Sequence, residues 1–116
     1  MQFDSSIPIY LQVSEAIKQD IVAGRRLPGD KLPSGRELAL LYRINPNTAA
    51  RVYQVLESEG VCISRRGLGT FVREDGDLAE RIRREMAEEN IDRFVSSMRE
   101  MGFGKEEILA MVKEAL

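Results

Sequence analysis

Apolar residues recur at helical spacing in the first part of the chain, directly after Pro8. Positions separated by three, four and four residues form a single stripe, which is typical of an amphipathic helix with one buried face. The stripe consists of Tyr10, Val13, Ile17 and Ile21. Proline suits the start of a helix because its missing N–H needs no partner there, and Gly24 is a frequent kind of stop. The pattern therefore predicts a first helix from Pro8 to about Ala23.

A second, shorter helix is predicted after a turn-rich connection. Residues 25–33 (RRLPGDKLP) contain two prolines and a Pro-Gly pair, which are typical of turns. Ser34 is followed three residues later by Glu37, the spacing of a capping box, in which each side chain accepts a backbone N–H of the other residue. The second helix is therefore expected to begin at Ser34. Its expected buried face consists of Leu38, Leu41 and Tyr42.

The third helix has two faces of opposite character. Asn45-Pro46 predicts an N-cap followed by proline at the first helical position, and Gly60 marks the end of the helix near Glu59. At about 100° per residue, apolar and polar side chains separate onto opposite sides. The apolar side carries Ala49, Val52, Tyr53 and Leu56, and the polar side carries Asn47, Arg51, Gln54 and Ser58. On an isolated helix this polar side would be ordinary surface, but after a capped short helix and a tight turn it indicates a helix-turn-helix.

A β-hairpin is predicted next. The segments 61–64 and 70–73 are rich in residues that favour strands, and Arg65-Arg66-Gly67-Leu68-Gly69 lies between them as a turn. Exposed hairpins often carry arginine only for solubility. Two adjacent arginines at the tip of a hairpin that follows a recognition helix favour a contact with the DNA backbone or minor groove. Three helices followed by a hairpin predict a winged helix-turn-helix over residues 1–73, so the fold class is mainly α with a small β-hairpin.

The remaining chain is expected to be a polar hinge, residues 74–77, and a helical tail, residues 78–116. After Leu78, Ile82 and Met86, apolar positions recur at spacings of four, three, four and three, which is a heptad-like seam. The seam consists of Ala87, Ile91, Phe94, Met98 and Met101. A second short stripe, beyond Gly102 and Gly104, consists of Ile108, Met111, Val112, Ala115 and Leu116.

Two short helices are too small to bury both stripes by themselves. The most economical partner is the same element of a second subunit, which predicts a homodimer held by a two-helix dimerisation tail. The expected interface residues are Ile91, Phe94, Met98, Met101, Ile108 and Val112. The alternative, in which the tail folds back on the winged domain of a monomer, stays open.

Composition excludes most catalytic and metal chemistry. The chain has no histidine and one cysteine, so it cannot form a Ser-His-Asp triad, a histidine-containing zinc site or a thiolate cluster. Neither a Walker nor a Rossmann glycine pattern is present, and the Gly67/Gly69 pair fits a hairpin turn. We therefore expect no enzyme activity, no cofactor and no metal site. The flanks of Cys62 predict a buried strand thiol, with a redox switch as the less favoured alternative.

Charge is distributed unevenly along the chain. Residues 1–73 carry ten Lys/Arg and seven Asp/Glu, a net of +3, whereas residues 74–116 carry seven and twelve, a net of −5. The basic half is suited to phosphates, and the acidic half is better kept away from them. The first residues do not resemble a signal peptide, and no apolar run approaches the ~20 residues of a membrane helix. We expect a cytoplasmic protein with no membrane partner.

Residues 8–73 resemble the GntR family of bacterial repressors along nearly their whole length. The segments 8–12 (PIYLQ) and 27–30 (LPGD) match the family's opening and first connection. The second-helix signature is similar to residues 31–39, the recognition helix to Asn45-Pro46-Asn47-Thr48 with Arg51, and the wing to residues 65–72. The short tail is similar to that of the YtrA-type subfamily, whose members dimerise through it and often control transporter genes. The resemblance implies a repressor that binds double-stranded DNA at a palindromic operator.

The family's DNA-contacting positions correspond to residues of all three DNA-facing elements. These are Arg36 in the second helix, Asn47, Thr48 and Arg51 in the third, and Arg66 and Gly67 in the wing, where Arg65 is adjacent. Position 50 is alanine where many relatives have an arginine, so base readout is expected to rest on Arg51, Asn47 and Thr48. Two questions stay open: whether a small-molecule effector binds, and whether the winged helix instead serves as a protein-interaction module without specific DNA readout.

Overall fold

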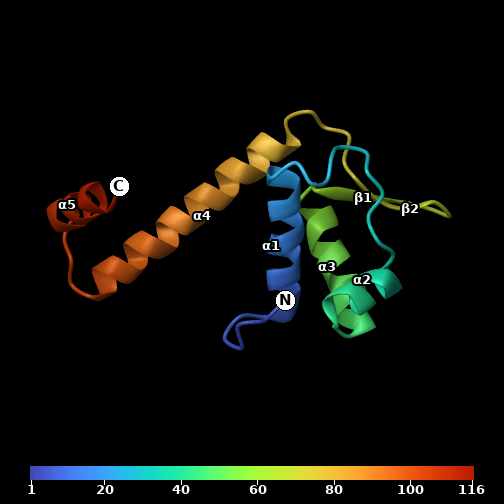
Figure 1. Ribbon diagram of the computed structural model, residues 1–116, viewed down its shortest axis with the longest axis horizontal. Coiled ribbons are helices and arrows are strands. Elements are labelled where there is room, and N and C mark those ends of the chain that lie inside the picture. The colour runs from blue at the N-terminus through green and yellow to red at the C-terminus, as the bar shows by residue number, and fades with distance from the viewer. The chain divides into compact units, whose positions relative to one another are not determined.

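The computed structural model describes residues 1–116 and contains five helices and one two-stranded antiparallel sheet (Figure 1). In chain order the elements are α1 (Ile9–Val22), α2 (Gly35–Tyr42), α3 (Pro46–Ser58), β1 (Cys62–Arg65), β2 (Gly69–Val72), α4 (Leu78–Glu100) and α5 (Lys105–Ala115). The chain forms two compact units, Met1–Ile82 and Arg83–Leu116. No helix is both long and apolar enough to span a bilayer. The predicted fold class, mainly α with one small hairpin, is confirmed.

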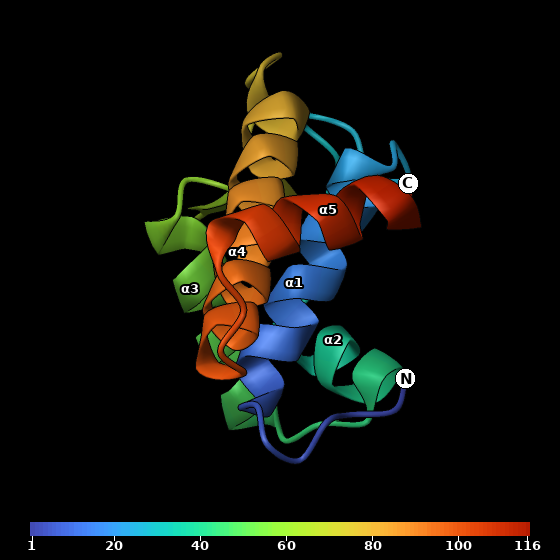
Figure 2. The same ribbon diagram turned by 90° about the vertical axis from the view of Figure 1, so that its left-hand side faces the viewer.

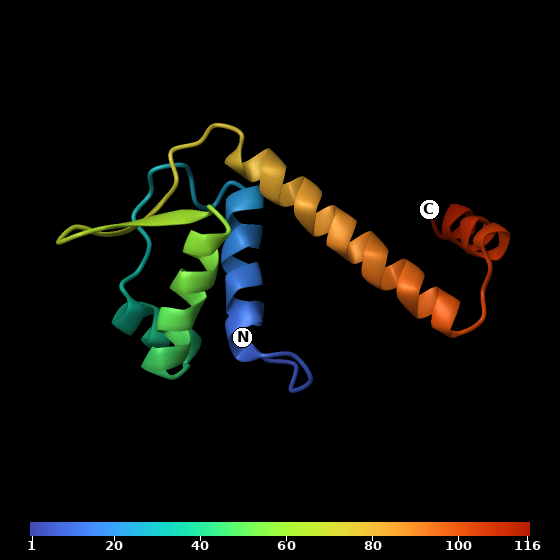
Figure 3. The ribbon, with the colours of Figure 1, turned by 180° about the vertical axis from the view of Figure 1, so that it is seen from behind.

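Helices α1 and α3 form the centre of the first unit, where they lie side by side (Figures 1 and 3). Val13 and Ile17 of α1 and Ala49, Val52 and Leu56 of α3 are fully buried. Both apolar stripes predicted from the sequence therefore face each other, which removes them from water. The other α3 residue of the predicted apolar face, Tyr53, is 8% exposed, and its hydroxyl donates to the Pro33 carbonyl.

Helix α2 begins with the predicted capping box. The Ser34 hydroxyl accepts the Glu37 N–H at 3.1 Å, and the Glu37 carboxylate accepts the Ser34 N–H at 3.0 Å. The helix ends at Arg43, which takes a left-handed conformation with φ of 55° and turns the chain toward α3.

The prediction for one core residue of α2 is wrong. Leu41 is 62% exposed, whereas Leu38 is fully buried and the unpredicted Ala39 is 6% exposed. On a helix, positions 39 and 41 lie on opposite sides of position 38, so only one of them is buried together with Leu38. The small Ala39 side chain is the buried one, and Leu41 is exposed to solvent.

The hairpin is built by antiparallel pairing of Cys62 with Val72 through Arg65 with Gly69. Each strand is displaced by one residue from the predicted segments, toward the tip. The connection before α2 also pairs with the hairpin: the Leu32 N–H donates to the Thr70 carbonyl at 2.8 Å, and the Val72 N–H donates to the Asp30 carbonyl at 2.8 Å. The wing is therefore braced along β2 by a segment that the sequence indicated only as turns.

The first turn of α4 belongs to the winged unit. Leu78 and Ile82 are 0% and 1% exposed. Arg81 donates to the Gly60 carbonyl at 3.1 Å and to the Glu59 carbonyl at 3.4 Å, two carbonyls that follow the end of α3. A cation is favourable at a helix C-terminus, where backbone carbonyls lack helical partners. The compact winged unit thus extends to Ile82, and the division of the chain by function stays a prediction.

The second unit contains the rest of α4 and the short helix α5, which are joined by a loop (Figure 2). In that loop Gly102 has φ of +91°, and the Phe103 N–H donates to the Met98 carbonyl at 3.1 Å. The residues of the expected dimer seam fall into two groups. Met98 and Ile108 are buried within the single chain, and Val112 is half-buried. Ile91, Phe94 and Met101 are exposed by 59%, 41% and 63%.

Candidate nucleic-acid interface

The polar side of α3 is exposed, as the sequence predicted. Asn47, Arg51 and Gln54 are exposed, and Thr48 is half-buried in the first turn. The Asn45 side chain caps the helix by accepting the Asn47 N–H at 2.8 Å. Because the Asn47 N–H is already bonded, we expect Asn47 to contact DNA through its exposed side-chain amide.

Arg51 has a specific neighbour on α1. Its guanidinium lies 3.9 Å from the centroid of the Tyr10 ring, and one of its terminal nitrogens donates to the Tyr10 hydroxyl at 3.3 Å. Tyr10 was predicted only as the first member of the α1 apolar stripe, but it is half-buried and supports Arg51. The sequence carried no signal for this pair, because the two residues are far apart in the chain and meet through helix packing.

Arg36 is exposed in the first turn of α2. Its neighbour Glu37 uses its carboxylate in the capping box, and the hydrogen bonds from Ser34 hold the pKa of Glu37 below its usual value. The capping carboxylate is therefore fixed toward the backbone of Ser34, and Arg36 presents its own charge at the start of the helix.

The wing presents Arg65, Arg66 and Gly67, all of them exposed. The Leu68 N–H donates to the Arg65 carbonyl at 2.9 Å and closes the turn, in which Gly67 has φ of +76°. The Arg65 guanidinium lies 5.9 Å from the centroid of the Phe71 ring, the outer limit of a cation–π contact. The tip thus holds two adjacent cations on a short, braced hairpin.

A third cation beside the wing was missed by the sequence analysis. Lys31 is exposed and forms an isolated antiparallel β-bridge with Phe71 of β2. Its side chain approaches the backbone of the wing, since a Cβ atom placed on Gly69 would lie 2.9 Å from the Lys31 Cε. It was overlooked because residues 25–33 were interpreted as turns, although proline and glycine in that segment do not exclude pairing with a strand.

The candidate residues fall into a helix group and a wing group. Arg36, Asn47, Thr48 and Arg51 come from α2 and α3, and Arg65, Arg66 and Gly67 from the hairpin tip. Figures 1 and 3 show α2 and the hairpin on the same side of α1. The ion pairs of the winged unit join Lys18 to Glu59 and join Arg25 and Arg26 to Asp20, and none of these involves an arginine of either group.

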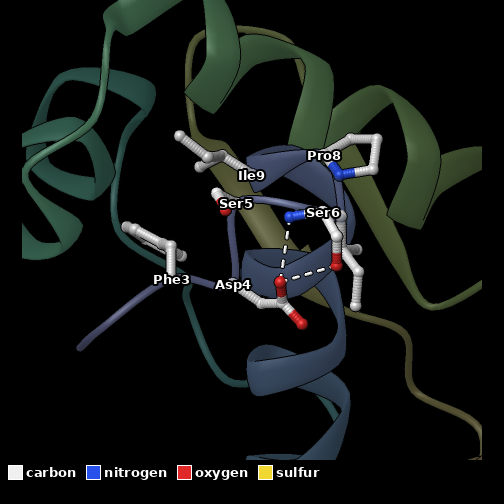
Figure 4. A pocket seen from close by; sticks show the side chains of 7 residues that line it. Phe3, Asp4, Ser5, Ser6, Pro8 and Ile9 are labelled. Atoms are coloured by element: carbon white, nitrogen blue, oxygen red, sulfur yellow. Dashed lines mark hydrogen bonds between the residues drawn. The ribbon is translucent and has the colours of Figure 1, made fainter.

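Two other features do not add to the interface. A surface pocket at the start of the chain is lined by residues 3–9 (Figure 4), but the Asp4 carboxylate in it accepts the Ser6 N–H and hydroxyl, which lowers the pKa of Asp4 and keeps it anionic. An anion there disfavours phosphate. The thiol of Cys62 is 1% exposed, and burial raises its pKa to about 12, which is the environment of an inert core thiol.

Comparison with known proteins points to one family. Residues 9–72 match the model described as bacterial regulatory proteins, gntR family. The chain is 43% identical over 112 residues to the HTH-type transcriptional regulator YhcF of Bacillus subtilis (strain 168), a match that covers 97% of this chain and 93% of that protein. It is 46% identical over 71 residues to the HTH-type transcriptional repressor YtrA of the same organism, covering 61% of this chain and 55% of YtrA.

Solved structures agree with this assignment. A GntR family transcriptional regulator from Listeria monocytogenes is similar with a TM-score of 0.82 and 39% identity, over 97% of this chain and 98% of that one. The DNA-binding domain of AraR, in complex with operator ORR3, is similar with a TM-score of 0.56 and 33% identity, over 62% of this chain and 87% of that one. The second likeness is to a DNA-binding domain that is in complex with an operator.

Proposed function

The chain belongs to the gntR family of bacterial regulatory proteins, which are DNA-binding transcription regulators and not enzymes, and we propose that it reads a specific operator through α3 and the wing. Asn47, Thr48 and Arg51 contact base edges in the major groove. Arg36 contacts the backbone beside the groove. The wing residues Arg65, Arg66 and Gly67 contact the backbone or the minor groove.

The observation that carries the proposal is the exposed, unpaired positive charge on two separate DNA-facing elements. Arg51 lies on the polar side of α3, and Arg65 and Arg66 lie at the hairpin tip, while the ion pairs of the winged unit are formed by other residues. Arginines that are not neutralised by carboxylates can release counterions from phosphates or bond a guanine edge. The AraR domain, which has a similar fold, is bound to an operator, and this supports the same use of the domain here.

We further propose that the regulator acts as a homodimer on an inverted repeat. Ile91 and Phe94 on α4, together with Met101 directly after its end, form an exposed apolar stripe, and such a stripe is uncommon on a monomer. Pairing of two tails would cover it and present two recognition helices to half-sites about one DNA turn, roughly 34–36 Å, apart. Met98, Ile108 and Val112 would support that surface from within each chain.

The proposed direction of regulation is repression. YtrA, to which the chain is 46% identical over 71 residues, is a transcriptional repressor by name. A bound repressor dimer blocks transcription by occupying its operator, and a transporter operon is the proposed target. An effector that binds between the tail helices would change the spacing of the recognition helices and release the operator. The methionines of the tail are flexible, which makes such repacking feasible.

Selection from a random library of duplex DNA tests the proposal. The full chain is expected to enrich one inverted repeat, and a footprint on that duplex should protect both half-sites. Enrichment of no sequence would contradict specific readout and would favour the alternative, in which the winged unit binds another protein. Enrichment of a single half-site without its inverted copy would contradict the dimer while leaving base readout intact.

A further inference from the structure

We propose that Tyr10 of α1 is a positioning residue for sequence readout, because it holds the guanidinium of Arg51 in place before DNA is bound. The inference rests on the proposed function, in which Arg51 contacts a base. Its evidence is the contact between the two side chains: a distance of 3.9 Å from the guanidinium to the ring centroid and a hydrogen bond of 3.3 Å to the hydroxyl.

The chemistry of the pair suits this role. A guanidinium carries five N–H donors, and the Tyr10 hydroxyl accepts from one terminal nitrogen of Arg51, so other donors remain for a bidentate bond with a base. Tyrosine is neutral, so it orients Arg51 without cancelling its charge, as an aspartate or glutamate in the same place would do. The hydrogen bond at 3.3 Å is long and therefore weak, which allows Arg51 to exchange it for a bond with DNA.

Tyr10 is itself held on a rigid support. Val13 and Ile17, on the same helix, are fully buried against the rest of the winged unit. The Ser14 hydroxyl donates to the Tyr10 carbonyl at 2.7 Å, and Ser14 is 2% exposed. These contacts hold the α1 backbone that carries the half-buried Tyr10 ring, whereas a long arginine side chain on an exposed helix face would otherwise lose much rotamer freedom on binding. Ordering Arg51 before binding reduces that loss.

A double-mutant cycle on the full chain tests the inference. The probes are the duplex enriched by the wild-type chain, its single-base variants and a duplex of random sequence. Tyr10→Leu should weaken binding to the enriched duplex about two- to fivefold, the range expected for an exposed cation–π contact, with little change on random DNA. In an Arg51→Ala background the same substitution should have no further effect, because the partner is already absent. Tyr10→Phe should retain most of the affinity because it keeps the ring.

Controls separate positioning from a general loss of structure. Tyr42→Leu removes another half-buried tyrosine, from α2, and should leave base preference unchanged. Equal weakening on enriched and random DNA by Tyr10→Leu, or an equal loss in the Arg51→Ala background, would overturn the inference alone. Unchanged base preference in Arg51→Ala would remove Arg51 from readout and the inference with it. Failure of the wild-type chain to enrich any duplex would overturn the proposed function as well.

Discussion

Arg51 is the residue on which base readout is expected to depend most, since it lies on the exposed side of α3 and is held by Tyr10. Arg51→Ala should lower affinity for the operator by about 1–3 kcal/mol and flatten the preference at one base pair of each half-site, because a bidentate contact with a base is lost. Titration against the operator and its single-base variants measures both effects.

A matched control is Arg25→Ala, which removes an exposed arginine that is paired with Asp20 outside the interface. It should leave base preference unchanged. If Arg51→Ala weakens binding to operator and random DNA by the same factor, Arg51 contacts phosphate and does not read a base.

Single residues were predicted well where local sequence decides their environment. The capping box of Ser34 and Glu37 and the exposed side of α3 follow from spacing alone, and both are present. Leu41 and the partner of Arg51 depend on how α2 and α1 pack against α3. Spacing within one short helix cannot tell which of several apolar positions is buried by a neighbouring helix, so these features needed the folded structure.

At the scale of elements, the wing is the part whose arginines are expected to act without regard to sequence. Replacing Arg65 and Arg66 by alanine should weaken binding to all duplexes. It should also reduce the slope of the logarithm of affinity against the logarithm of salt concentration by up to about two, because two phosphate contacts are lost. Affinity measured against salt concentration for variant and wild type gives the slope. An unchanged slope together with weaker operator binding would mean that the wing does not act through phosphates.

The wing also contains a glycine that its backbone requires. Gly69 has φ of +121°, and a Cβ there would lie 2.9 Å from the Cε of Lys31. Gly69→Ala should therefore lower the free energy of unfolding by about 1–3 kcal/mol through backbone strain at this φ, since the flexible end of Lys31 can move aside. Gly76→Ala is the matched control, since no atom lies within 4 Å of its Cβ position. Urea unfolding compares them, and equal stabilities of the two variants would contradict the strain.

Helix ends were the most predictable elements, because capping residues and glycines mark them chemically. The hairpin was predicted with its strands one residue off, since short strands have no comparable end signal. The pairing of residues 29–32 with β2 was not predicted. It depends on contacts between distant segments, and the prolines of that segment indicated only turns.

For the whole molecule, the tail is expected to form the dimer. Phe94→Asp places a charge in the exposed stripe of α4 and should convert the dimer to a monomer that still binds a half-site, with cooperative binding to the inverted repeat lost. Sedimentation of the wild type and the variant at micromolar concentration measures the assembly. Leu40→Asp, at a residue of α2 that is 76% exposed, is the control and should remain dimeric. A monomeric wild-type chain would contradict the prediction.

The organisation of the chain was only partly predictable from its sequence. The seam of residues 87–101 and the polar segment 74–77 suggested a tail that starts at Leu78. The structure packs Leu78 and Ile82 into the winged unit, and it buries Met98 and Ile108 within the second unit. An apolar stripe predicts that its residues will be buried from solvent, but tertiary packing decides which surface buries each of them.

Affinity of the full chain for duplex DNA, measured across a series of salt concentrations, tests the central claim most directly. We predict that binding to the enriched duplex weakens steeply as salt rises: the logarithm of the binding constant should fall against the logarithm of salt concentration with a slope of about −0.9 for each phosphate contacted. A scrambled duplex of equal length should bind more weakly at every salt concentration. Binding that does not change with salt, or that is equal for both duplexes, would contradict the claim that α3 and the wing read an operator.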